Sequence, residues 1–216
     1  MGFLQQLKDR ATDVQARQGQ VTRDLEGHLA VTEAACQRVW QYLSELATQL
    51  NILQPAARPL ALDPRVPWPA MKLTDFRFDA RRKILRTREV FEHLALGWRV
   101  VPVEPCCPVQ GEVSVNFPPD LSRVEARLRA GQIRFNRVEE RNPETHKLLA
   151  VRFEHDMAAR GSVVFTPVHD EARMQLRLQG VVGFQVQSLD LAAHEVGIER
   201  LDDLARAIVG DVDVVR

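Results

Sequence analysis

The chain has 216 residues, of which 45% are hydrophobic and 27% charged, a composition typical of a folded protein rather than a disordered or membrane-embedded one. Lys plus Arg and Asp plus Glu each number 29, so no net charge draws the chain to nucleic acid or to an anionic membrane. The N-terminal segment MGFLQQLKDR lacks the apolar core of a signal peptide, and the three cysteines do not suggest a disulfide framework, so we expect a cytoplasmic protein.

Residues 1–53 are predicted to form one long helix. This segment contains no proline, and steps of three and four alternate without a break from Leu4 to Leu46, which is the seam of a heptad repeat over about six heptads. At 1.5 Å per residue such a helix is about 75 Å long. A second apolar column widens the stripe in the second half, at Leu29, Cys36, Leu43 and Leu50. We therefore expect the second half to pack on the protein's own core.

The first half of this helix is predicted to be an assembly element. Its narrow seam would leave apolar side chains in water unless another helix covered it, and a second copy of the chain is the simplest partner. Gln18 and His28 loosen the seam but are able to set its register. A different protein partner is the alternative. The seam residues proposed for assembly are Leu4, Leu7, Val14, Val21 and Leu25.

Residues 54–71, QPAARPLALDPRVPWPAM, are predicted to be a connector. Five of the 12 prolines of the chain lie here, and they stop the helix and hold the backbone extended. Leu60, Leu62 and Trp68 are the side chains expected to lay the connector against the body.

Residues 72–216 are predicted to form an α+β domain. Apolar and polar residues alternate in several segments, as in Leu94–Val100 and Met174–Leu178, which is typical of antiparallel strands with one buried face. We expect one sheet of about seven strands, covered on one face by helices. Two segments have helical spacing between proline or glycine residues: PPDLSRVEARLRAG, with Leu121, Val124 and Leu128, and IERLDDLARAIVG, with Ile198, Leu201, Leu204, Ala205 and Ile208.

Two His-Asp pairs, His155-Asp156 and His169-Asp170, are the feature closest to an active site, because such pairs are typical of metal-dependent hydrolases. A turn is predicted at Ala158–Gly161, and the strand that follows it would separate the pairs by more than about 20 Å. Metal ligands must lie within about 2 to 2.5 Å of one ion, so we predict no joint site. Asp170 is expected to bond backbone amides in a turn, and His155 to be half-buried on its strand.

The other candidate chemistry is weaker. Cys106 and Cys107 are adjacent between two prolines and lack the further ligands that a zinc site needs. Cys36 is expected in the core. The chain has neither a phosphate-binding glycine loop nor a nucleophile elbow. We therefore predict no catalytic residues, no metal and no cofactor.

Arginines on the polar positions of several strands suggest a second kind of site. If these positions share one sheet face, they form a surface suited to phosphate or carboxylate groups. The neighbouring acidic residues favour ordinary cross-strand ion pairs instead, and the lack of aromatic residues at polar positions argues against nucleic acid. The arginines concerned are Arg77, Arg81, Arg82, Arg99, Arg134, Arg152, Arg173 and Arg177.

The sequence thus favours a non-enzymatic, cytoplasmic protein that self-associates or binds a protein partner through its N-terminal helix. The first alternative is a module that binds an anion or small molecule on the arginine-rich face, with nucleic acid as a remoter ligand. An uncharacterised hydrolase is the third.

Overall fold

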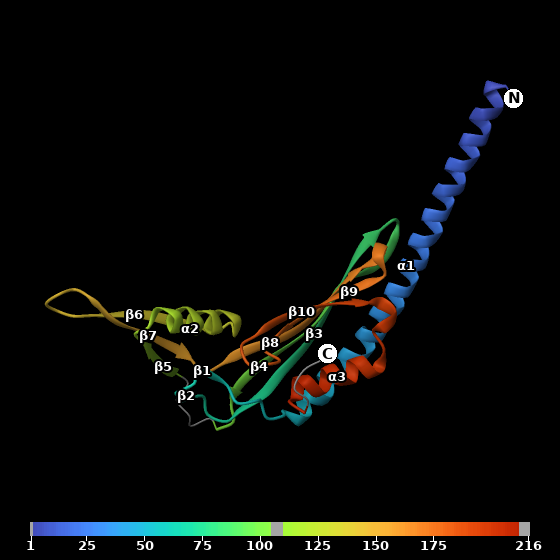
Figure 1. Cartoon of the computed structure of the whole chain (residues 1–216). Coiled ribbons are helices and arrows are strands. Elements are labelled where there is room, and N and C mark those ends of the chain that lie inside the picture. Colours follow the sequence, from blue (N-terminus) through green and yellow to red (C-terminus); the bar gives the residue numbers. More distant parts are fainter. Residues whose placement is uncertain (1, 105–109, 212–216) are drawn as a thin grey trace.

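The computed structural model describes residues 2–104 and 110–211, and of residues 4, 6, 7 and 9 it describes the backbone only. The fold is α+β, as predicted: a long N-terminal helix is followed by antiparallel sheets and two further helices. Figure 1 shows a curved body from one end of which the N-terminal helix projects.

Helix α1 (Phe3–Leu53) is continuous over 51 residues, because no proline interrupts its hydrogen bonds. It ends where Gln54 takes a left-handed conformation with φ of 43° and Pro55 follows. Its second half packs on the body and buries the widened stripe that the sequence predicted. The fully buried side chains of this stripe are Ala35, Cys36, Val39 and Leu43.

The larger sheet has five antiparallel strands in the order β10-β9-β8-β4-β3. Their bounds are β3 (Met71–Leu85), β4 (Arg88–Pro102), β8 (Ala159–Val168), β9 (Arg173–Gln179) and β10 (Val186–Ala192). The long β3–β4 hairpin turns at Arg86 and Thr87, whose positive φ angles are typical of two-residue hairpin turns. Its tip lies beside α1 (Figure 1).

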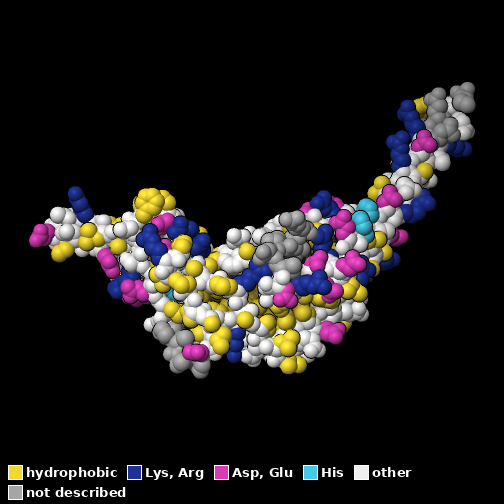
Figure 2. All heavy atoms as spheres, turned by 60° about the horizontal axis from the view of Figure 1, so that its bottom comes forward, with side chains coloured by type: hydrophobic (Ala, Val, Ile, Leu, Met, Phe, Trp, Pro, Cys, Tyr) yellow, Lys and Arg dark blue, Asp and Glu magenta, His cyan; other side chains and the backbone are white. Residues whose placement is uncertain are grey.

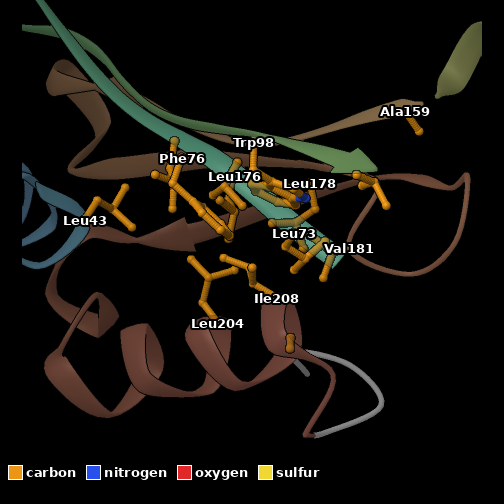
Figure 3. Packing of buried hydrophobic residues seen from close by; sticks show 14 of the residues in the cluster. Leu43, Leu73, Phe76, Trp98, Ala159, Leu176, Leu178, Val181, Leu204 and Ile208 are labelled. Atoms are coloured by element: carbon orange, nitrogen blue, oxygen red, sulfur yellow. The ribbon is translucent and has the colours of Figure 1, made fainter. Parts of the chain in front are cut away.

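Helix α3 (Ile198–Val209) lies with α1 on one face of the larger sheet, and the main core fills the space between them. In Figure 3, Leu204 and Ile208 of α3 point toward Leu73, Trp98 and Leu176 of the sheet. Tyr42 of α1 donates a hydrogen bond of 2.6 Å to Asp202 of α3, so the two helices are also joined to each other. Ile198 departs from the predicted face: it is 65% exposed, since it lies in the first turn, beyond the sheet contact.

A smaller three-stranded sheet forms the other end of the body, in the order β5-β7-β6. Its strands are β5 (Gln110–Val115), β6 (Phe135–Arg141) and β7 (Leu148–Asp156), and it is accompanied by helix α2 (Pro118–Ala130). Val124 and Leu128 of α2 are buried in the same core as Phe153 of β7.

The connector is more regular than predicted. Leu60, Leu62 and Trp68 are buried against the body, as expected. However, the segment also contains a small pair of strands, β1 (Ala61–Asp63) and β2 (Val66–Pro67). Short turns of 3-10 helix, η1 (His169–Glu171) and η2 (Ala193–Glu195), complete the fold.

The expectation of a single sheet of about seven strands is wrong. The described residues form sheets of five, three and two strands. Alternating polarity shows which face of a strand is buried, but it is the same whichever strand lies alongside. The partition into sheets was therefore not visible in the pattern.

Candidate functional site

His155 is a buried side chain of the smaller sheet. It lies near the end of β7, where its ring stacks on that of Trp68, with centroids 5.6 Å apart and planes 14° apart. Its Nδ1 donates to the carbonyl oxygen of Asp156 at 3.1 Å. The sequence placed His155 half-buried, whereas the connector covers it with Trp68, and the stacked ring makes it a packing element.

Burial makes the protonation of His155 unfavourable and lowers its pKa below the ordinary value of 6.5, although the Asp156 contact works in the opposite direction. The unfolded chain therefore takes up a proton more readily than the folded chain as the pH falls below about 6.5. We expect the contribution of His155 to the free energy of unfolding to be steady above this value and to decrease as the pH falls through the window down to the folded pKa.

The check is urea unfolding of the native chain and of His155→Phe between about pH 7.5 and about pH 5. Phe keeps a ring against Trp68 but removes the titrating group. The His155→Phe curve should be the flatter of the two. Parallel pH curves would show that His155 is not protonated differently in the folded and unfolded chains.

His169 lies at the opposite end of β8 and connects the sheet to α1. Its Nε2 donates to Oε1 of Glu33 at 2.9 Å, and the same oxygen accepts the backbone N–H of Phe91 at 3.0 Å. His169 is buried, so its polar ring needs this partner. The role that these contacts support is structural: they hold α1 to the larger sheet.

Asp170 does not act as the turn residue that the sequence suggested. Its carboxylate pairs with Arg86 at the tip of the β3–β4 hairpin, at 2.7 Å, rather than with neighbouring backbone amides. Its carbonyl oxygen accepts from Nδ1 of His28 at 2.7 Å. The hairpin tip and the helix come close enough to offer these stronger partners, which short-range patterns could not reveal.

The two His-Asp pairs lie at opposite ends of β8, as predicted, in different surroundings. Within the part of the chain that the structure describes, no three His, Cys, Asp or Glu side chains gather as a metal site would require. Cys106 and Cys107 lie outside the described residues. Cys36 is buried in the core, where burial and then the charge of Glu33 raise its pKa to about 12, so its thiol is protonated and unreactive.

The eight predicted arginines do not lie on one surface. Five of them occupy the face of the larger sheet opposite α1 and α3: Arg77, Arg81, Arg99, Arg173 and Arg177. Arg152 belongs to the smaller sheet, and Arg134 directly precedes its strand β6. Arg82 lies over the ring of Phe91, with its guanidinium carbon 4.3 Å from the ring centroid.

Most of these arginines have acidic partners. Arg173 pairs with Asp190 at 2.6 Å, Arg81 with Asp79 at 3.7 Å and Arg82 with Glu89 at 3.3 Å. Arg152 is surrounded by carboxylates of its own sheet, at Glu112, Glu140 and Glu154. For Arg82, Arg152 and Arg173 the cross-strand ion pairs expected from the sequence account for the pattern. Arg81 instead pairs with Asp79 of its own strand.

Arg99, Arg134 and Arg177 have no acidic partner among the described residues, and Arg99 also has a neighbour that sequence reasoning missed. We predicted a turn up to Gly161, but β8 begins at Ala159, so Arg160 is a strand residue directly opposite Arg99. Arg160 has the same strand parity as Ser162, which points away from the core. This parity could have placed Arg160 on the outward face, but only once the strand is known to start at Ala159.

The N-terminal half of α1 presents the predicted seam to solvent. Val14 is 52% exposed and Val21 is 57% exposed, while Leu25 is half-buried against the β3–β4 hairpin. Figure 2 shows this segment as a narrow rod on which hydrophobic, basic and acidic side chains all reach the surface. The side chains of Leu4 and Leu7 lie outside the described part. On the same seam, Val39 is fully buried by the body.

Comparisons of the chain with models of protein families, with curated proteins and with solved structures found no significant match. Among the described residues, no helix combines the length and the apolar character needed to cross a bilayer.

Proposed function

We propose that this protein is a non-enzymatic assembly protein whose copies associate through the projecting part of α1, Phe3–Leu25. The observation that carries the proposal is the change of environment along one continuous seam. Val39 is buried by the protein's own body, whereas Val14 and Val21 have the same chemistry and spacing and are more than half exposed. Each side chain of this kind gains about 1.5 kcal/mol or more when it is fully buried.

The length of the segment suits a helical pair. Its heptads run from the first turn to Leu25, about three repeats, which is near the lower limit for a stable coiled coil. A pair of this length is expected to associate weakly and in a concentration-dependent manner.

The charges on the segment favour a second copy of the chain in antiparallel orientation. With Leu7 opposite Leu25 of the second copy, the heptad positions place Arg10 of each copy beside Asp24 of the other. A parallel pair would instead place Arg10 beside Gln15 and form no such ion pair. One like-charge contact, Arg17 with Arg17, opposes the antiparallel arrangement and limits its strength.

A hollow at the base of the projecting segment supports the same orientation. It lies between α1 and the hairpin tip, has a volume of about 160 Å³, and is lined by Leu25, Leu29, Arg86 and Arg88 among others. In the antiparallel pair the first turn of the second copy would arrive at this hollow, because Leu7 pairs with Leu25.

The test is sedimentation velocity of the full chain over a range of concentrations, together with Val14→Lys/Val21→Lys. The native chain is expected to approach the mass of a dimer at tens of micromolar, and the double variant to remain a monomer with an unchanged circular dichroism spectrum. A matched control, Thr12→Lys/Ala16→Lys, adds the same charge on exposed positions off the seam and should still associate.

Orientation is tested by exchanging charges. Arg10→Asp alone should weaken association, and Arg10→Asp/Asp24→Arg should restore it, because the exchanged pair has the original complementarity. A native chain that stays a monomer at all concentrations would rule out self-association and leave a foreign partner for the seam. Failure of the exchange to restore association in a chain that dimerises would rule out the antiparallel register.

A further inference from the structure

A hollow on the open face of the larger sheet is lined by Gly97 and its cross-strand neighbours. This face is opposite the one that α1 and α3 cover. Gly97 of β4 lies between Arg77 of β3 and Ser162 of β8, and in the next outward row Arg99 lies opposite Arg160. The hollow has a volume of about 430 Å³, and Asp75 and Gln132 complete its polar rim.

The charges around the hollow are unbalanced. Arg77 is paired with Asp75 at 2.9 Å. Asp75 is the only acidic residue in the described lining. Arg99 and Arg160 are direct cross-strand neighbours, and neither guanidinium makes a hydrogen bond or an ion pair with any described residue. Like charges placed directly opposite each other on a sheet are destabilising, so this pair has no benefit for folding.

Other arginines on the same face have acidic partners. Arg81 and Arg173 both have acidic neighbours within 3.7 Å. Arg177 of the same face also has no acidic partner among the described residues, but it lies opposite Val164 and Ser188. The hollow is distinguished by two unpaired arginines, Arg99 and Arg160, that lie directly opposite each other.

The floor of the hollow is left open by Gly97 itself. A Cβ added at this position would meet only the carbonyl oxygen of Gly161, at 3.9 Å, so packing does not require glycine here. Glycine in the middle of a strand weakens the strand, and one recognised use of it is the close approach of a ligand to the backbone.

We propose that this hollow binds a small molecule that carries two or more negative charges on phosphoryl or carboxylate oxygens. Arg99 and Arg160 form the two sides of a clamp, because guanidinium groups bind such oxygens in bidentate fashion. Ser162 and Gln132 supply neutral donors, and the ligand approaches the backbone above Gly97. The volume suits a small ligand. This site is on the body and does not depend on self-association through α1.

The test is calorimetric titration of the full chain with pyrophosphate and, separately, with succinate, in a buffer without multivalent anions. Saturable binding of one of them is expected, and the better ligand identifies the phosphoryl or the carboxylate source. Arg99→Gln and Arg160→Gln should each weaken binding by tenfold or more. The matched controls Arg81→Gln and Arg173→Gln remove the same charge from paired arginines of the same face and should change affinity less than twofold.

A variant that fills the hollow without altering charge distinguishes anion binding at a defined site from anion attraction by the general positive charge of the face. Gly97→Val should abolish binding while the chain keeps its native circular dichroism spectrum and unfolding transition. Equal losses in the four arginine variants, with binding intact in Gly97→Val, would overturn the proposal, as would the absence of saturable binding of both probes. Tighter binding of a single-stranded oligonucleotide that Gly97→Val leaves unchanged would also contradict it, and would indicate a nucleic-acid surface instead.

Discussion

Gly161→Val is expected to lower the free energy of unfolding by about 3 kcal/mol, at the upper end of the usual cost of overpacking a core. A side chain at this position of β8 would overlap the indole ring of Trp98, its direct cross-strand neighbour on β4. Trp98 cannot turn aside easily, because it is buried and stacks on Phe76 with centroids 5.9 Å apart. Urea unfolding followed by circular dichroism measures the change.

Gly97→Ala is the matched control for this prediction. Gly97 is also a strand glycine, on the neighbouring strand, but it faces the open side of the sheet and leaves ample space for a Cβ. The alanine variant should be as stable as the native chain or slightly more so, because alanine loses less backbone entropy on folding. If both variants were equally destabilised, backbone conformation and not the contact with Trp98 would be responsible.

Leu43→Ala is the second substitution with a large expected effect, a loss of about 3 kcal/mol of unfolding free energy. Leu43 is fully buried and points from the second half of α1 toward the sheet core in Figure 3. Removing its side chain would leave a cavity between α1 and the sheet that rigid neighbours cannot fill. The urea midpoint and the thermal midpoint should both decrease.

A truncation at an exposed position of the same helix tests whether the cost of Leu43→Ala comes from lost packing on the sheet or from a change within the helix itself. Ile52 is 74% exposed, and Ile52→Ala makes a comparable truncation in a residue with little contact. Its effect should stay within about 0.5 kcal/mol. A cost for Leu43→Ala as small as that for Ile52→Ala would mean that the second half of α1 does not depend on the sheet for stability.

Much of the local structure could be predicted, because local residues determine it. The absence of proline before Pro55 and the unbroken heptad spacing from Leu4 onward are sufficient for a continuous α1. The alternation of Leu94, Leu96 and Trp98 was sufficient to place these side chains on a buried face. Strand β10, by contrast, was not predicted, since Leu189 and Leu191 form too short an alternation to stand out.

The candidate sites were predicted less completely. The seam residues Val14 and Val21 came from spacing alone, and the structure leaves their side chains exposed. Arg99 was also among the predicted residues, but Arg160 was not, because its strand was expected to begin after it. The contact between them depends on the pairing of β4 with β8, and these strands are far apart in the chain.

The sequence by itself determined the long helix, the α+β class and the face that each strand buries, because these depend on the spacing of residues within a few turns or pleats. Only the tertiary structure decided how the strands divide into sheets, where along α1 the body ends, and which arginines lack an acid. Val14 and Val39 show why: they are chemically identical and share one seam, yet Val14 precedes the part of α1 that meets the hairpin tip and is exposed, whereas Val39 is buried in the core. Burial depends on which distant segments pack alongside, and that is a property of the whole folded chain.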